Sequence, residues 1–167
     1  QILGILLEKV TDMRYSEYLS TRLWQPLKAE DASLWLDRPK GNPKPFCCLF
    51  ATTRDWAKVG QLLLNNGKVN DTQIVSSNWI KKMLTPSSLE SVYGLHIWLQ
   101  ARLQNKPTMS KTASQSFLAT DTFYLDGNAN QRVYIIPSAE LVIVRVGEQT
   151  NNWDDAFIPN SLVRSLN

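Results

Sequence analysis

Apolar residues in the first part of the chain recur every three to four positions. This period is typical of amphipathic helices, and it predicts one helix over residues 2–10 and a second over residues 15–23. Each helix is expected to bury one face. The apolar positions that carry the first helix are Ile2, Ile5, Leu6 and Val10.

Prolines and a glycine interrupt the pattern between residues 26 and 50, which predicts a long irregular loop. A threonine cap then opens an amphipathic helix that ends at Asn65-Asn66-Gly67. Ser76 and Ser77 can cap another helix, which ends before Pro86.

The second half of the chain has the short apolar runs of β-strands. Strands are predicted over residues 93–100, 123–126, 132–137 and 140–147, the last two joined by a tight turn. These two are so continuously apolar that both of their faces should be covered. Asp154-Asp155 then starts a C-terminal helix through Leu166, with its acids at the end that the helix dipole favours. The order predicts an α+β fold, an antiparallel sheet flanked by helices.

Length and charge exclude several classes of protein. The chain has 167 residues, 18 Lys and Arg against 15 Asp and Glu, and a net charge of +3. The basic residues are spread out, which argues against a nucleic-acid partner. No apolar run approaches the roughly 20 residues of a transmembrane segment, and no signal peptide is visible, so the sequence is expected to be a piece of something longer.

Metal and disulfide chemistry have little support. Cys47 and Cys48 are adjacent, and we expect two thiols packed beside Phe46 and Phe50. A structural zinc site needs about four Cys or His ligands, and His96 is the only histidine. Its place in a predicted strand flanked by aromatic residues indicates a structural histidine.

Catalytic motifs are absent from these residues. There is no Ser-x-x-Lys pair, no Gly-x-Ser-x-Gly elbow, and no phosphate-binding or dinucleotide-binding glycine loop. Asp154 and Asp155 are interpreted as helix-capping residues, because adjacent helical positions point apart. Lys111-Thr112-Ala113 is similar to a Lys-Thr-Gly strand motif but lies in a polar stretch, so it is treated as a false match.

Four segments in order carry a resemblance to a known family. Together they are similar to the C-terminal half of the serine β-lactamase and penicillin-binding-protein superfamily, in particular its 6-aminohexanoate-dimer hydrolase and class C-like esterase branch. The segments are Leu3 to Leu27, Ala51 to Leu64 with Gly67 and Trp79, Tyr93-Gly94 with Trp98, and Gly127 to Arg145.

The resemblance implies a β-lactamase-like sheet flanked by helices, incomplete because the N-terminal part of the domain is absent. Residues 1–167 would form a single segment of that domain. The family's nucleophilic Ser, its Lys and the catalytic Tyr of Tyr-x-Asn would all lie upstream, so no catalytic residue is assigned in this chain. No metal and no cofactor are implied. The expected partners are the N-terminal portion of the same domain, whose strands would pair with the open sheet edge, and a small-molecule or peptide-like substrate.

One wall of the family's site is implied here, at Gly127, Asn128, Ala129 and Asn130. Family members place substrate along this strand and use a backbone N–H as part of an oxyanion hole; by position this is the Asn128 N–H. The sequence departs from the family pattern, because Asn130 stands where Gly is usual and no Lys or His is near. That departure argues against carboxylate recognition and β-lactam turnover. The alternative interpretation is that Asp126 to Asn130 is a plain turn of residues that tolerate positive φ.

Three functions remain open at this stage. The parent protein is predicted to be a serine hydrolase that cleaves an amide, ester or β-lactam through an acyl-enzyme, although the isolated chain lacks the nucleophile. It could instead be a non-catalytic relative that binds peptide or cell-wall fragments. An independent binding domain that uses some of its six Trp residues is the third possibility. A periplasmic or secreted location is common in the family.

Overall fold

The computed structural model describes residues 1–107 and 109–166. The chain divides into two compact units, Gln1–Lys58 and Val59–Asn167, which we call unit 1 and unit 2. The interpretation of the chain as one segment of a longer domain stays a prediction. Among the described residues, no helix has the length and apolarity that crossing a membrane requires.

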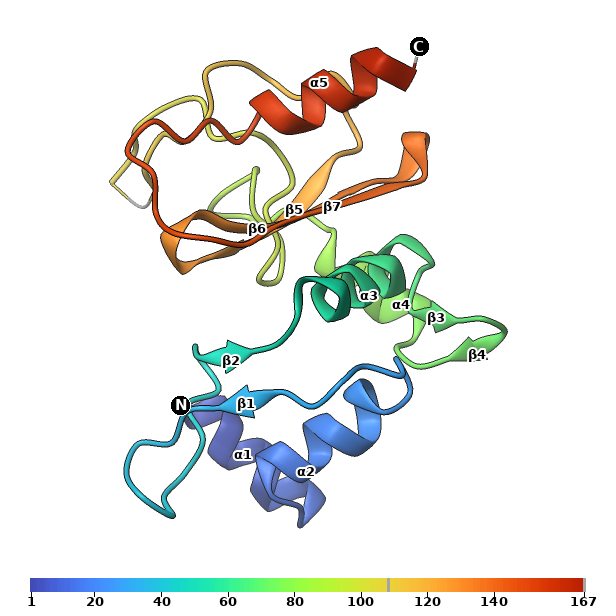
Figure 1. The fold of residues 1–167 in the computed structure, drawn as a ribbon, viewed down its shortest axis with the longest axis vertical. Coiled ribbons are helices and arrows are strands. Elements are labelled where there is room, and N and C mark those ends of the chain that lie inside the picture. Colours follow the sequence, from blue (N-terminus) through green and yellow to red (C-terminus); the bar gives the residue numbers. More distant parts are fainter. Residues whose placement is uncertain (108, 167) are drawn as a thin grey trace. The chain divides into compact units, whose positions relative to one another are not determined.

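Unit 1 begins with the two predicted helices (Figure 1). Helix α1 spans Ile2–Thr11, and α2 (Tyr15–Leu19) continues into a π-helical turn, η1 (Ser20–Trp24). The predicted loop after them is largely irregular. It contains one short antiparallel pair of strands, β1 (Ser33–Leu34) and β2 (Leu49–Phe50).

The expectation that α1 buries one face is wrong for the described structure. Only Gly4 is buried in this helix, where an added Cβ would lie 2.6 Å from Pro45 Cγ. Ile2 and Val10 are 80% and 75% exposed. The helical period is therefore present, but Ile2, Leu3 and Val10 are exposed in the described structure.

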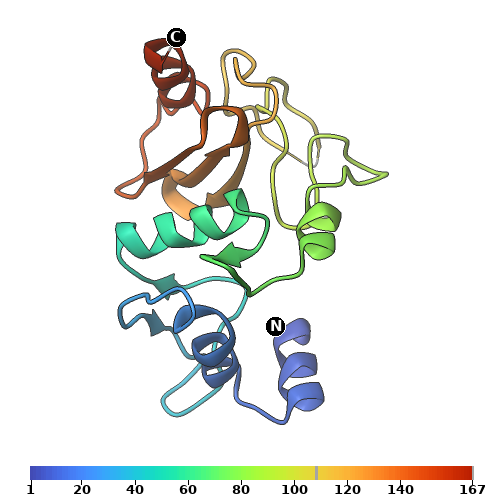
Figure 2. The same ribbon diagram turned by 90° about the vertical axis from the view of Figure 1, so that its right-hand side faces the viewer.

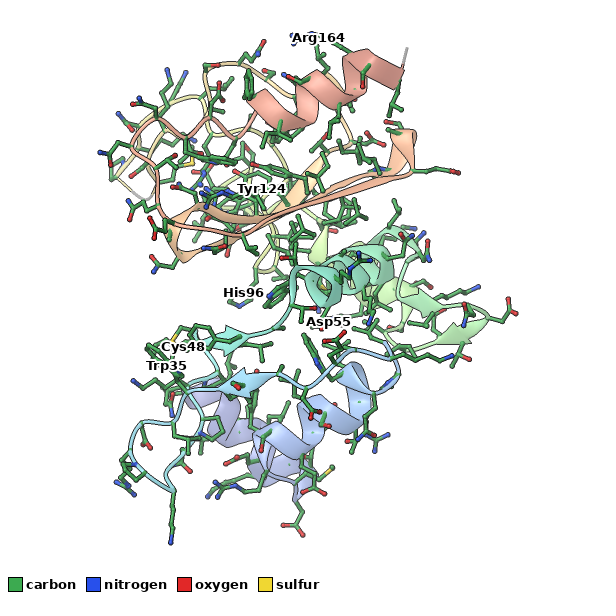
Figure 3. The ribbon with its side chains drawn as sticks, viewed as in Figure 1. Trp35, Cys48, Asp55, His96, Tyr124 and Arg164 are labelled. Carbon is green, nitrogen blue, oxygen red and sulfur yellow. A yellow bond between two sulfur atoms is a disulfide. The ribbon has the colours of Figure 1, made fainter. Side chains whose placement is uncertain are left out.

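Helix α3 (Thr53–Leu64) is the predicted threonine-capped helix, and its start is fixed by Asp55. Thr52 Oγ donates to Asp55 Oδ2 at 2.7 Å, and the Asp55 N–H donates back to Thr52 Oγ at 3.2 Å. The Glu30 N–H and Lys58 Nζ donate to Asp55 Oδ1 at 3.2 and 2.8 Å. This fully buried carboxylate thereby joins the loop to the helix (labelled in Figure 3).

The end of α3 also follows the sequence signal. The Gly67 N–H donates to the Leu62 carbonyl at 2.8 Å, and Gly67 has a φ of 82°, which glycine adopts without steric cost. A short hairpin, β3 (Lys68–Val69) and β4 (Thr72–Gln73), comes next. Helix α4 (Ser77–Met83) starts as predicted, with Ser76 Oγ accepting from the Trp79 N–H at 3.2 Å.

A three-stranded antiparallel sheet forms the centre of unit 2, in the order β5-β6-β7. The strands are β5 (Phe123–Gly127), β6 (Gln131–Ile136) and β7 (Leu141–Arg145), with short 3-10 turns η2 (Asn128–Asn130) and η3 (Pro137–Ala139) between them. They match the predicted strands within a residue or two. Strand β6 is buried as expected, whereas β7 is only half-buried.

Helices lie on both faces of this sheet. Residues 59–64 of α3 face one side, where a Cβ on Gly60 would lie 2.5 Å from Val142 Cγ1 and 2.9 Å from Val133 Cγ1. Helix α5 (Phe157–Leu166) lies on the other side (Figures 1 and 2). Asn160 anchors α5 by donating to the Ser116 carbonyl at 2.9 Å. The described part of the chain thus has the predicted α+β arrangement.

The strand predicted over residues 93–100 is wrong. Gly94 N–H donates to the Ile97 carbonyl at 2.8 Å, and His96 has a φ of 59°, so the segment folds into a turn. Only Trp98 joins the sheet, through a single bridge to Tyr124. His96 is exposed at this turn and does not lie in the predicted strand.

Candidate functional site

The four residues predicted to form the substrate wall come together in the turn between β5 and β6. Gly127 is the last residue of β5 and pairs with Gln131. Asn128, Ala129 and Asn130 form η2, in which Ala129 and Asn130 have φ values of 57° and 60°. The turn is therefore built from two consecutive left-handed residues at the end of the hairpin.

Arg145 holds this turn in place from the third strand. Its Nη1 donates to the carbonyls of Ala129 and Asn130 at 2.7 and 3.1 Å. The left-handed conformation costs a residue such as Ala129 about 1–2 kcal/mol, and these bonds oppose that cost. Asn tolerates the conformation better, and Asn130 Oδ1 also accepts from the Thr150 N–H at 3.2 Å. Asn130 therefore fits the position at which the resembling family has Gly.

The backbone of Asn128 leaves a hydrogen-bond donor available at the turn. Its carbonyl accepts from the Gln131 N–H, which closes the 3-10 turn. Its own N–H finds no acceptor within the part of the chain that the structure describes. Asn128 is exposed, so this N–H can donate to an oxygen that comes from outside the unit.

A buried arginine connects the turn to the interior of unit 2. The Arg132 side chain is 2% exposed, and its Nη1 donates to the Gly127 and Gln131 carbonyls at 3.3 and 2.9 Å. The same nitrogen binds the Asp126 carboxylate, and Nε donates to Asp155 Oδ1 at 2.7 Å. Arg132 thus fixes both ends of the turn to two carboxylates.

Asp155 is the centre of this buried cluster. Tyr134 and Trp153 donate to its Oδ1 at 3.0 and 2.6 Å, and Thr112 donates to its Oδ2. Arg102 Nη2 lies 3.5 Å from Asp155 Oδ2 and 2.6 Å from Asp126 Oδ2. We call these residues the Asp155 cluster: Arg102, Thr112, Tyr124, Asp126, Arg132, Tyr134, Trp153 and Asp155.

One cation–π contact, one further hydrogen bond and one unpaired nitrogen complete the description of the cluster. The Arg102 guanidinium lies 4.4 Å from the centre of the Trp98 ring, a cation–π contact. The hydroxyl of Tyr124, which is labelled in Figure 3, donates to Asp155 Oδ2 at 3.4 Å. Arg102 Nε is buried without a hydrogen-bond partner in the described structure.

The two carboxylates of the cluster have opposite pKa shifts. Burial favours a raised pKa for Asp155, but the hydrogen bonds from Arg132 and Thr112 outweigh it and hold the pKa below the usual range. Burial raises the pKa of Asp126, despite the attraction of Arg132 and Arg102. Burial, followed by the nearby charge of Asp155, raises the pKa of Tyr134, so this hydroxyl stays protonated and can donate.

Sequence reasoning missed this cluster and assigned Asp155 to the wrong role. Asp155 is fully buried among the arginines, whereas Asp154 Oδ1 accepts from the Ala156 N–H at 3.0 Å, just before α5 begins at Phe157. One signal was available in the sequence. Arg132 and Tyr134 alternate within an apolar strand, so both lie on one face of the sheet.

Lys111-Thr112-Ala113 lies in a loop, as expected of a false match to the strand motif. It lines an open hollow of about 380 Å³, together with Asn105, Ser114, Trp153 and Asp154. No residue of the η2 turn lines this hollow. The described residues contain no group of three His, Cys, Asp or Glu side chains that could hold a metal ion.

The described residues show no activated nucleophile. Nowhere in residues 1–107 and 109–166 does a serine hydroxyl hydrogen-bond to a lysine or histidine side chain. Activation of a hydroxyl for acyl transfer requires such a base. What this chain offers is a turn that Arg145 and Arg132 hold in place, with the Asn128 N–H free to donate.

Comparison with known proteins places this architecture in a family. The beta-lactamase family model matches residues 1–165. A curated relative, 6-aminohexanoate-dimer hydrolase of Paenarthrobacter ureafaciens, is 35% identical over 95 residues, which cover 54% of this chain and 23% of that protein. The chain therefore spans about a quarter of the curated relative that it matches.

Solved structures agree with the family match. A putative 6-aminohexanoate-dimer hydrolase from Bacillus anthracis superposes with a TM-score of 0.67 at 25% identity, covering 98% of this chain and 38% of that one. A beta-lactamase from Mycobacterium bovis superposes with a TM-score of 0.68 at 17% identity, covering 98% and 59%. The second likeness is one of fold. Because the family model extends over nearly all of its residues, the chain belongs to the beta-lactamase family of hydrolases.

Proposed function

We propose that this chain supplies the C-terminal wall of the active site of a serine hydrolase. The nucleophile and its lysine, in a Ser-x-x-Lys motif, belong to an upstream part of the domain, as does the tyrosine of Tyr-x-Asn. The reaction is transfer of an acyl group from an amide, ester or β-lactam to the serine, followed by hydrolysis of the acyl-enzyme.

The observation that carries the proposal is the available N–H of Asn128. It lies in a turn held by Arg145 and by the buried Arg132, so it needs no rearrangement to meet a developing oxyanion. The nucleophile's own N–H is the second donor of the oxyanion hole. Asn128 and the turn around it are then substrate-contacting residues, and the Asp155 cluster beneath them acts by positioning.

A linear amide is the first substrate to test. Two similar proteins are called 6-aminohexanoate-dimer hydrolases, and the turn here lacks an adjacent Lys or His that would recognise a carboxylate. We therefore expect the complete enzyme to cleave short amides and esters faster than β-lactams.

The test uses the chain together with its upstream segment. Labelling by a serine-reactive fluorophosphonate should appear in the complete protein and be absent from residues 1–167 alone. Asn128→Pro, which removes the N–H, should lower the acylation rate by about 10²–10³-fold. Asn128→Ala keeps the N–H and should stay within a few-fold of wild type.

Thermal unfolding of both variants shows whether the turn survives the substitution. Equal acylation rates of folded Asn128→Pro and Asn128→Ala would show that the Asn128 N–H is not part of the oxyanion hole. A complete protein that takes no label and cleaves no ester or amide would contradict the hydrolase itself, and would favour a non-catalytic relative that binds peptide or cell-wall fragments.

A further inference from the structure

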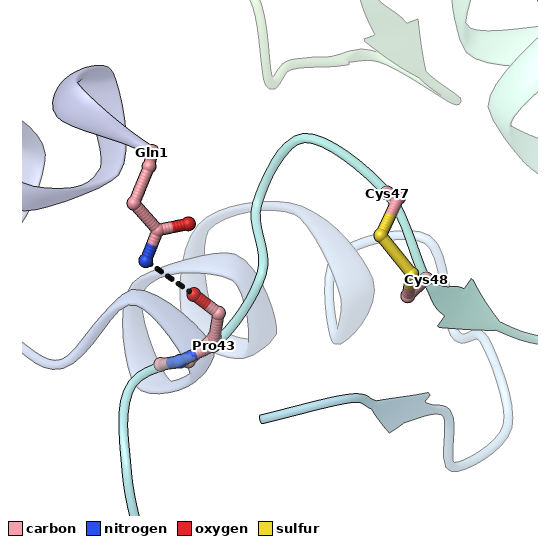
Figure 4. The surroundings of a disulfide bond; sticks show 4 residues. All are labelled: Gln1, Pro43, Cys47 and Cys48. Carbon is pink, nitrogen blue, oxygen red and sulfur yellow. Dashed lines mark hydrogen bonds between the residues drawn. A yellow bond between two sulfur atoms is a disulfide. The ribbon is translucent and has the colours of Figure 1, made fainter. Parts of the chain in front are cut away.

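The adjacent cysteines of unit 1 form a disulfide, so the expectation of two packed thiols is wrong. We propose that the Cys47–Cys48 disulfide is a redox-reversible modification site, opened by a dithiol reductant and coupled to the β1–β2 hairpin. The proposal is independent of the hydrolase activity. Figure 4 shows the bond in the segment that leads from Pro43 to β2.

The bond does not act as a conventional stabilising crosslink. A disulfide stabilises a fold mainly by closing a long loop of the unfolded chain, and the effect grows with the number of residues enclosed. Cys47 and Cys48 are neighbours, so their bond encloses no intervening residue. Its consequence must therefore lie in the local conformation of the loop.

The sulfurs lie in an accessible part of unit 1. Cys47 is exposed and Cys48 is half-buried. The surrounding aromatic side chains are also open to solvent, since Phe46, Trp35 and Phe50 are 68%, 57% and 50% exposed. A thiolate must approach one sulfur along the S–S bond, and an exposed loop allows that approach without unfolding.

The backbone of the disulfide is directly connected to the hairpin. The Cys48 carbonyl accepts from the Trp35 N–H at 3.1 Å, and the Trp35 carbonyl accepts from the Lys44 N–H at 3.0 Å. The Trp35 ring lies 5.1 Å from that of Phe50 in β2. A change in the backbone at Cys48 is therefore transmitted to Trp35.

The backbone of Cys48 has a conformation that could relax when the disulfide opens. Its φ is 71°, a left-handed value that residues with a Cβ seldom adopt. Opening of the ring with Cys47 removes the covalent constraint on this residue. Cys48 can then return to negative φ, which turns its carbonyl away from the Trp35 N–H.

The chemistry is a balanced two-electron exchange. One thiolate of the dithiol attacks a cysteine sulfur, the S–S bond breaks, and the other cysteine leaves as a thiolate that takes up a proton. The second thiol of the reductant then displaces the first cysteine. Two cysteine thiols form, and the dithiol becomes a disulfide. The chain has only these two cysteines, so no third thiol within it can exchange with them.

The first experiment counts thiols in the folded chain. Iodoacetamide should add nothing to the air-equilibrated protein and should modify both cysteines after brief treatment with dithiothreitol without denaturant. Phenylarsine oxide should bind the reduced chain in a one-to-one ratio, releasing one water as arsenic joins both sulfurs. Two free thiols before reduction, or a bond that opens only in denaturant, would overturn the proposal.

The second experiment tests the coupling to the hairpin. Reduction should shift the backbone amide resonances of Trp35 and Lys44, and reoxidation should restore them. Cys47→Ser should resemble the reduced state under all conditions. The matched variant Cys48→Gly accommodates positive φ without a ring, so it should resemble the oxidised state and show no redox response. Unchanged Trp35 and Lys44 resonances on reduction of wild type would refute the coupling.

Discussion

At the scale of single residues, the buried carboxylate of Asp155 is the centre of a hydrogen-bonded cluster in unit 2. Among the described residues, it receives hydrogen bonds from five side chains, most of them distant in the sequence: Thr112, Tyr124, Arg132, Tyr134 and Trp153. Loss of one partner of a buried ion pair leaves the other charge uncompensated, which typically costs 3–5 kcal/mol.

We therefore expect Asp155→Asn to lower the free energy of unfolding by about 3–5 kcal/mol at neutral pH, measured by urea denaturation. Asp71→Asn makes the same chemical change at an exposed turn residue of unit 2. It should change the free energy of unfolding by less than about 0.5 kcal/mol. Equal effects of the two substitutions would show that the cluster does not stabilise the fold.

The pKa of Asp155 gives a prediction for acid conditions. Its pKa in the folded chain lies below the ordinary value of 3.8, so the charged form stabilises the fold at neutral pH. That stabilisation is lost as the pH falls through the folded pKa. The stability difference between wild type and Asp155→Asn should therefore shrink as the pH falls from about 5 toward 2, measured by urea denaturation at each pH.

Both proteins in this comparison retain Asp126, whose raised pKa gives an opposite dependence on pH. The charge of Asp155 is one cause of that raised pKa, so the Asp126 contribution is smaller in the variant than in wild type. A difference between wild type and variant that stays constant down to pH 2 would contradict the lowered pKa of Asp155.

At the scale of elements, the contact between α3 and the sheet depends on the absence of a side chain. A Cβ on Gly60 would come within 2.5 Å of Val142 Cγ1. Overpacking of this kind costs about 1–3 kcal/mol, which exceeds the roughly 1 kcal/mol that Ala gains over Gly in a helix.

Gly60→Ala should therefore destabilise unit 2, and the loss should depend on Val142. In a double-mutant cycle followed by thermal unfolding, Val142→Ala should cost less in the Gly60→Ala background than in wild type, because the smaller side chain makes room for the new methyl group. Additive effects would mean that α3 and β7 are not in close contact at this point.

Element boundaries were predictable where a local signal sets them. Ser76 and Gly67 define helix ends through bonds to their own neighbours, so the sequence pattern was sufficient. Residues 93–100 look like a strand, yet the Leu95 N–H donates to the Met83 carbonyl at 3.0 Å and the segment turns. That hydrogen bond joins residues that are not neighbours in the sequence, so no local sequence pattern indicates it.

The same distinction applies to the candidate site. Asp126 to Asn130 could be identified as a turn from residues that tolerate positive φ, and the structure confirms the turn at Asn128–Asn130, while Asp126 and Gly127 belong to β5. The support beneath it could not be predicted, because Asp155 is remote in sequence from the Arg132 that it binds. A local interpretation of Asp155 as a helix cap was consequently wrong.

At the scale of the whole molecule, α1 carries an apolar surface that nothing described here covers. Leu3 is 70% exposed. The family relationship, in which this chain covers 38% of a similar structure, supports the proposal that the upstream portion of the domain packs on this face. The same portion would supply a strand to the open edge of the sheet.

This proposal predicts that one substitution has two different effects. Leu3→Ala should change the stability of the 167-residue chain by less than about 0.5 kcal/mol, but should cost about 2–5 kcal/mol in the complete protein, where the side chain is buried. Leu62→Ala is the control, because Leu62 is 3% exposed and should be costly in both. A small effect of Leu3→Ala in the complete protein would mean that the upstream portion does not pack on α1.

The order of the cluster residues along the chain also determines when unit 2 can fold during synthesis, because Asp155 follows all three strands. A ribosome delivers all three strands of the sheet, and both buried arginines, before the carboxylate that neutralises them. Until that residue emerges, Arg102 and Arg132 have only Asp126 as an acidic partner in the cluster. Unit 2 can therefore complete the Asp155 cluster only after Asp155 itself has been synthesised.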